Sequence, residues 1–96
     1  MEKNQETNDQ VKIDFLSYVS SLGFQAMIFL GEIESPVTKK KETNLLQAKF
    51  IIDTLVMLRD KTKGNLEPQE DNLLNVSIYE LQMKYVDQTA PKTEIT

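Results

Sequence analysis

Carboxylates are the side chains of this sequence best suited to chemistry, and Glu32 and Asp53 are the two that we single out. A carboxylate can act as a general acid or a general base, or can bind a divalent ion. Arg59 completes the candidate polar site, because its guanidinium could pair with a carboxylate of a neighbouring helix or subunit. The structural alternatives are that Asp53 accepts hydrogen bonds from a neighbouring backbone or from a lysine of residues 39–41, and that Arg59 extends its charge to solvent.

The residue types that most enzymes use are missing from the chain. It has 96 residues, with no cysteine and no histidine. The usual general base, the thiolate nucleophile and the commonest metal ligands are therefore absent, and no Glu-x-x-His pair or clustered carboxylate motif replaces them. We expect no catalytic activity, no cofactor and no metal. The alternative is a protein that binds a small ligand or a metal through carboxylates such as Glu32, Asp53 and Glu80.

Charge and composition narrow the expected partners and the compartment. The formal net charge is −4, whereas a nucleic-acid binder presents a basic patch, so we expect no nucleic-acid partner. The short basic run of residues 39–41 is interpreted as a solvated loop. The absence of disulfides agrees with a reducing compartment, and we expect a cytoplasmic protein.

The segment from Asn44 to Leu66 organises the rest of the chain. Asn44 can cap the start of a helix, and Gly64 can end it in a left-handed conformation. A helix is predicted over about residues 44–63. At 100° per residue its broad core face consists of Leu45, Ala48, Ile51, Ile52, Leu55, Val56 and Leu58.

A second, narrower apolar strip on the same helix consists of Leu46, Phe50 and Met57. A chain of this length has little core with which to cover a second strip. We therefore predict that the strip is a self-association surface. The alternative is that both faces of the helix are covered inside a three-helix bundle.

An earlier helix is predicted over about residues 12–30. Its core stripe has spacings of three and four and consists of Phe15, Val19, Leu22, Ala26 and Phe29. Its second half is apolar nearly all round, which indicates deep burial, and Phe24 and Ile28 join the candidate interface.

The same segment carries small and polar residues. Ser20, Gly23 and Ala26 predict the close approach of another helix. No charge occurs in residues 15–31, but polar residues dilute the segment, and we do not expect it to span a membrane. Peripheral membrane association through this helix is a further alternative.

A third helix is predicted over about residues 68–87, with Pro68 at its first position. Its main stripe consists of Leu74, Ile78, Leu81 and Tyr85, and a looser second surface consists of Leu73, Val76, Tyr79, Met83 and Val86. The fold class is therefore all-α, a three-helix hairpin or bundle that we expect to form a homo-oligomer, in the simplest case a homodimer. Residues 11–87 form the single domain, and residues 1–10 and 88–96 are predicted to be disordered tails.

Five strings in this order resemble a bacterial family of short helical proteins that is known as a domain of unknown function. They are SLGFQAMIFLGEI (residues 21–33), PVT (36–38), NLLQAKFIIDTLVML (44–58), KTKGNL (61–66) and YELQMKYV (79–86). The resemblance implies a small, soluble bacterial protein and implies no activity for it. Of the polar residues that match the family, Glu32 and Asp53 are the two without a ready structural role, and the choice of these two carboxylates rests on that match. The chain departs from the family at Glu67, where the family has a threonine N-cap, and at Lys39, where a glycine usually follows Thr38.

These observations favour a protein that acts by binding other protein chains. We expect a non-enzymatic interaction or adaptor module that self-associates through apolar helix faces and binds a protein partner whose identity the sequence leaves open.

Overall fold

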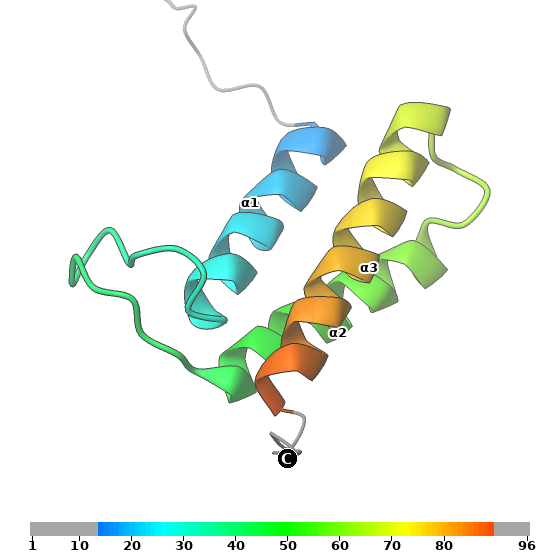
Figure 1. The fold of residues 1–96 in the computed structure, drawn as a ribbon. Helices are drawn as coiled ribbons and strands as arrows, with labels where there is room; N and C mark the ends of the chain where they lie inside the picture. Colours follow the sequence, from blue (N-terminus) through cyan, green and yellow to red (C-terminus); the bar gives the residue numbers. More distant parts are fainter. Residues whose placement is uncertain (1–13, 90–96) are drawn as a thin grey trace, which may run out of the picture.

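The computed structural model describes residues 14–89 and contains three helices in that range. They are α1 (Phe15–Phe29), α2 (Leu45–Lys61) and α3 (Pro68–Thr89). Each helix contacts the other two. α1 and α3 lie side by side and α2 crosses behind them (Figure 1). The predicted all-α class is confirmed. The predicted tail at residues 1–10 and the final residues 90–96 lie outside the described part.

Both ends of α1 are set by local hydrogen bonds. Asp14 is the N-cap, and its side chain accepts a hydrogen bond from the backbone N–H of Ser17 at 2.8 Å. At the other end the N–H of Glu32 donates to the carbonyl of Met27, and the N–H of Gly31 donates to that of Ile28, both at 3.0 Å. This is the Schellman arrangement, which requires a left-handed residue, and Gly31 supplies it with φ +81.

The long α1–α2 loop is closed at its base. Leu30 and Thr43 form an antiparallel bridge, and the N–H of Asn44 donates to the carbonyl of Phe29 at 2.7 Å. Asn44 then caps α2, because its side chain accepts from the N–H of Gln47 at 3.2 Å. The predicted cap is confirmed, and α2 begins beside the end of α1.

The α2–α3 connection is short and also fixed by hydrogen bonds. Both the N–H and the hydroxyl of Thr62 donate to the carbonyl of Leu58, at 2.9 and 2.7 Å. At the start of α3 the N–H of Glu67 donates to the side chain of Glu70 at 2.9 Å, which is one half of a capping box. The hydroxyl that a threonine would contribute to the other half is missing.

α3 continues to Thr89, beyond the predicted end near residue 87. The two additional residues include Gln88, whose side-chain amide donates a hydrogen bond to the carbonyl of Leu30 at 2.9 Å. The end of α3 is therefore tied to the end of α1.

One apolar core joins the three helices. Its buried members are Val19, Ala26, Leu30, Ala48, Ile51, Ile52, Leu55, Leu74, Ile78 and Leu81. All of them except Leu30 belong to the predicted stripes. The other stripe residues, such as Phe15, Leu22 and Tyr85, are partly buried against this core.

Two predictions about α1 are wrong. Ala26 is buried, but Ser20 is exposed, and a Cβ added at Gly23 would meet no atom within 4 Å. The close helix approach predicted for this group therefore holds at Ala26 alone. The second half of α1 is not deeply buried on all sides either, because three helices leave one side of each helix uncovered, and Phe24 lies on that side of α1.

Candidate functional site

The side of α2 that faces away from the core carries Leu46, Phe50 and Met57, which we call the α2 strip. Their exposed fractions are 79%, 68% and 46%. The strip lies opposite the core residues because, at 100° per residue, it is rotated by roughly half a turn from Ala48 and Leu55. From Leu46 to Met57 it runs about 17 Å along the helix. The three-helix packing therefore leaves the α2 strip uncovered.

The two α1 residues of the predicted interface lie in different surroundings. Phe24 is about half exposed and Ile28 is partly buried. Ile28 therefore has less side-chain surface to offer to a partner than the α2 strip has.

Asp53 lies beside the α2 strip and is paired within its own helix. The ammonium of Lys49, one turn earlier, lies 2.8 Å from its carboxylate. The side-chain hydrogen bond to Asp53, followed by the attraction of its charge, raises the pKa of Lys49. The predicted partners of Asp53, a neighbouring backbone or a lysine of residues 39–41, are wrong. Lys49 and Asp53 also line a shallow pocket of about 420 Å³ with Leu46, Gln47 and Phe50.

The other two residues of the candidate polar site have different neighbours. Glu32 lies 3.9 Å from the ammonium of Lys84 on α3. Arg59 is partly buried and lines a pocket of about 250 Å³ with Asp60, Lys63, Gly64, Asp71 and Asn75. The structure does not bring Glu32, Asp53 and Arg59 into one site. Within residues 14–89 no three acidic side chains are grouped so that they could hold a metal ion.

A second exposed strip lies on α3 and consists of Val76, Tyr79, Met83 and Val86, which we call the α3 strip. Their exposed fractions lie between 43% and 64%. The sequence pattern showed these residues as a loose second surface and did not show that nothing covers them.

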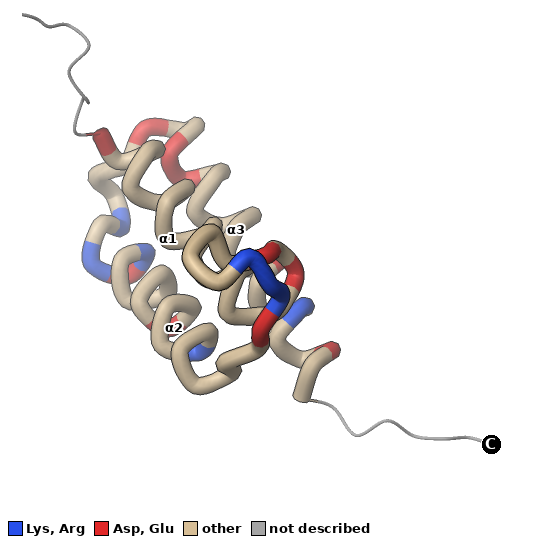
Figure 2. The backbone as a smooth tube through the Cα atoms, turned by 90° about the vertical axis from the view of Figure 1, so that its left-hand side faces the viewer, with Lys and Arg blue, Asp and Glu red and all other residues tan. Residues whose placement is uncertain are grey.

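The α1–α2 loop presents three consecutive lysines at its tip (Figure 2). The tip is a tight turn, because the N–H of Ser35 donates to the carbonyl of Lys40 at 2.9 Å and the N–H of Lys39 donates to that of Ser35 at 2.8 Å. Lys39 has φ +62, a left-handed conformation that is unfavourable for a residue with a Cβ. In the family that the sequence resembles, a glycine usually occupies the position of Lys39, and this glycine indicates a left-handed conformation there.

Lys39→Gly is expected to raise the free energy of unfolding by about 0.5–1 kcal/mol, because relief of the left-handed strain exceeds the added chain entropy of glycine. Urea titration measures the change. Lys40→Gly removes the same charge at a residue without a positive φ, so it should lower the stability by about 0.5–1 kcal/mol. Equal effects of the two substitutions would show that Lys39 is not strained.

Three helices around one core, with uncovered apolar strips on two of them, define a small all-α three-helix protein. Within residues 14–89 no helix combines the length and the apolar character that crossing a membrane requires. A family model described as "Domain of unknown function (DUF1844)" matches residues 12–87, and the chain belongs to this family. Comparison with curated proteins and with solved structures gives no match.

Proposed function

We propose that the protein is a non-enzymatic interaction module that self-associates through the α2 strip. The observation that carries the proposal is the exposure of three large apolar side chains, Leu46, Phe50 and Met57, on one side of one helix. Burying a side chain of this size is worth about 1.5–3 kcal/mol. A second copy that covers all three therefore stabilises both chains.

The spacing along the α2 strip suits pairing with a second helix. Leu46, Phe50, Asp53 and Met57 follow one another at intervals of four, three and four residues, the pattern of a coiled-coil seam. In a two-fold dimer the strip of one chain meets the same strip of the other. Asp53 is the one polar member of this seam, and its pairing with Lys49 at the edge allows the carboxylate to keep a partner next to an apolar contact.

Light scattering coupled to size exclusion tests the proposal. The wild type is expected at twice the chain mass of 11.0 kDa at micromolar concentration. Phe50→Lys is expected to reduce it to one chain mass, with the helical circular dichroism unchanged because Phe50 is exposed. The matched control is Phe24→Lys, which introduces the same charge at an exposed phenylalanine of α1 and should leave the dimer intact.

Two outcomes would contradict the proposal. A wild type that stays monomeric at high micromolar concentration removes self-association altogether. A dimer that survives Phe50→Lys and is lost in Phe24→Lys places the interface on α1 and not on the α2 strip.

A further inference from the structure

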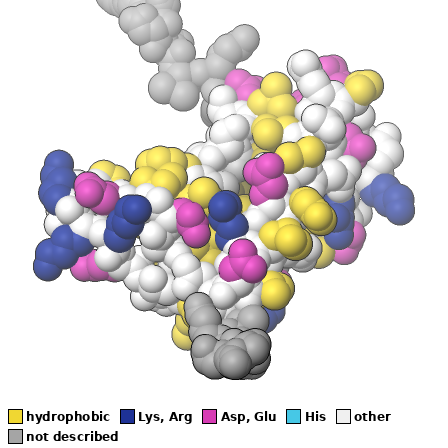
Figure 3. Space-filling view, viewed as in Figure 1, with side chains coloured by type: hydrophobic (Ala, Val, Ile, Leu, Met, Phe, Trp, Pro, Cys, Tyr) yellow, Lys and Arg dark blue, Asp and Glu magenta, His cyan; other side chains and the backbone are white. Residues whose placement is uncertain are grey.

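The α3 strip is a second apolar surface, and it lies on a different helix from the α2 strip. Val76, Tyr79, Met83 and Val86 follow at intervals of three, four and three residues, so they form one continuous line on the outer side of α3. The line is about 15 Å long, or nearly three helical turns. In Figure 3 hydrophobic and acidic side chains lie next to one another on the face over α3. Val86, at one end of this line, lines a pocket with Lys49 and Asp53 beside the α2 strip, and an α2-to-α2 dimer is expected to leave the other three residues uncovered.

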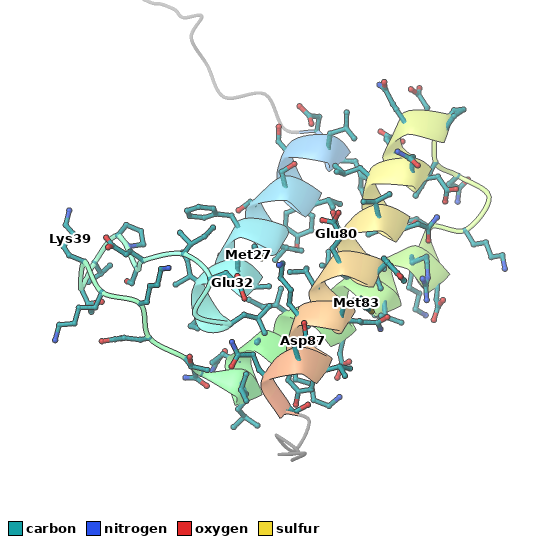
Figure 4. All side chains as sticks on the ribbon, viewed as in Figure 1. Met27, Glu32, Lys39, Glu80, Met83 and Asp87 are labelled. Atoms are coloured by element: carbon teal, nitrogen blue, oxygen red, sulfur yellow. The ribbon has the colours of Figure 1, made fainter. Side chains whose placement is uncertain are left out.

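The charges beside the α3 strip are mostly negative. Glu80 and Asp87 lie on the edge of α3 next to Met83, and Glu32 faces the same helix through its 3.9 Å contact with Lys84 (Figure 4). Three carboxylates and one ammonium group therefore lie at this edge of α3. Glu80, Met83, Lys84 and Asp87 also line a pocket of about 350 Å³ together with Tyr79. The surface is therefore apolar along its middle and acidic along the edge that faces α1.

We propose that the α3 strip docks a cationic amphipathic helix of a partner protein. An apolar stripe on such a helix would cover the α3 strip, and lysines or arginines beside that stripe would face Glu80 and Asp87. The flexible, polarizable side chain of Met83 adapts to apolar partners of different shape. The inference rests on the proposed function because it names a partner of the interaction module, but its surface is centred on α3 and not on α2.

The α2 strip of a second copy offers a weaker match to the α3 strip. α2 carries three basic and two acidic residues. Lys49 is already paired with Asp53 at 2.8 Å, and Arg59 and Lys61 lie in the last turn. The residues next to the α2 strip thus bring little free positive charge to the acidic edge of α3. Charge complementarity therefore favours a more basic helix from another protein.

The test measures fluorescence anisotropy of a labelled synthetic helix of leucine and lysine, titrated with the full chain. The wild type should bind this helix, and it should not bind the same helix with glutamate in place of lysine. Glu80→Lys is expected to weaken binding about tenfold, equivalent to 1.4 kcal/mol. Glu42→Lys makes the same charge change at an exposed loop residue and should weaken it less than about twofold.

Three results would overturn the inference. Equal losses in Glu80→Lys and Glu42→Lys would show that only net charge matters. A lower molar mass of Glu80→Lys without peptide would show that a second copy occupies the α3 strip. Absence of binding to the wild type removes the surface as a docking site for this class of helix.

The failure of this inference can be told apart from that of the proposed function. The Phe50→Lys chain should be monomeric and should still bind the cationic helix as the equally charged Phe24→Lys chain does. Loss of peptide binding in Phe50→Lys alone would show that the peptide binds at the α2 strip and would overturn the assignment to α3.

Discussion

Leu55→Ala is expected to lower the free energy of unfolding by about 3 kcal/mol. Leu55 is fully buried in the middle of α2 and belongs to the core that joins the three helices. Truncating a buried leucine costs the transfer of its methyl groups plus the cavity that remains, about 2–5 kcal/mol. A domain of this size has about 5–10 kcal/mol in total, so thermal unfolding followed by circular dichroism should show a midpoint about 12–24 °C lower.

Leu46→Ala is the matched control, since it is the same substitution in the same helix at a side chain that the three-helix packing leaves exposed. It should change the free energy of unfolding by less than about 0.5 kcal/mol when measured on the monomeric Phe50→Lys background. Equal losses from Leu55→Ala and Leu46→Ala would contradict the assignment of the core face of α2.

The helices and most of the core could be predicted from the sequence because both depend on local spacing. The predicted stripes on all three helices contain every buried core residue except Leu30. Leu30 is buried because the chain returns beside it and Thr43 bridges to it. The spacing of apolar residues along one helix does not predict a contact with a residue at the far end of a loop.

The candidate surface could be predicted in part. The α2 strip is visible on a helical wheel as the side opposite the core, and the structure leaves it exposed. The prediction of the polar site rests on residue types and on the family resemblance, neither of which places side chains in space, and the structure separates its members. The Lys49–Asp53 pair has the one-turn spacing of a helical ion pair and could have been found. The approach of Glu32 to Lys84 on α3 depends on how the helices pack and could not.

Gly31→Ala is expected to lower the free energy of unfolding by about 2–3 kcal/mol, and its cost has two physical causes. Gly31 adopts φ +81, where a residue with a Cβ loses about 1–2 kcal/mol. An added Cβ would also lie 2.7 Å from the hydroxyl oxygen of Thr43, at the base of the α1–α2 loop. Relieving that overlap means rotating the Thr43 side chain or moving the loop, at a further cost of about 1 kcal/mol.

Gly64→Ala separates the two causes, because Gly64 has φ +85 but an added Cβ there would meet no atom within 4 Å. It should cost only the backbone term, about 1–2 kcal/mol. Combining Gly31→Ala with Thr43→Ala should recover the difference, which appears as a coupling of about 1 kcal/mol in a double-mutant cycle from urea titrations. Two results together would contradict this account: no coupling in the cycle, and equal losses of unfolding free energy in Gly31→Ala and Gly64→Ala. They would show that Thr43 does not lie as close to Gly31 as the bridge to Leu30 requires.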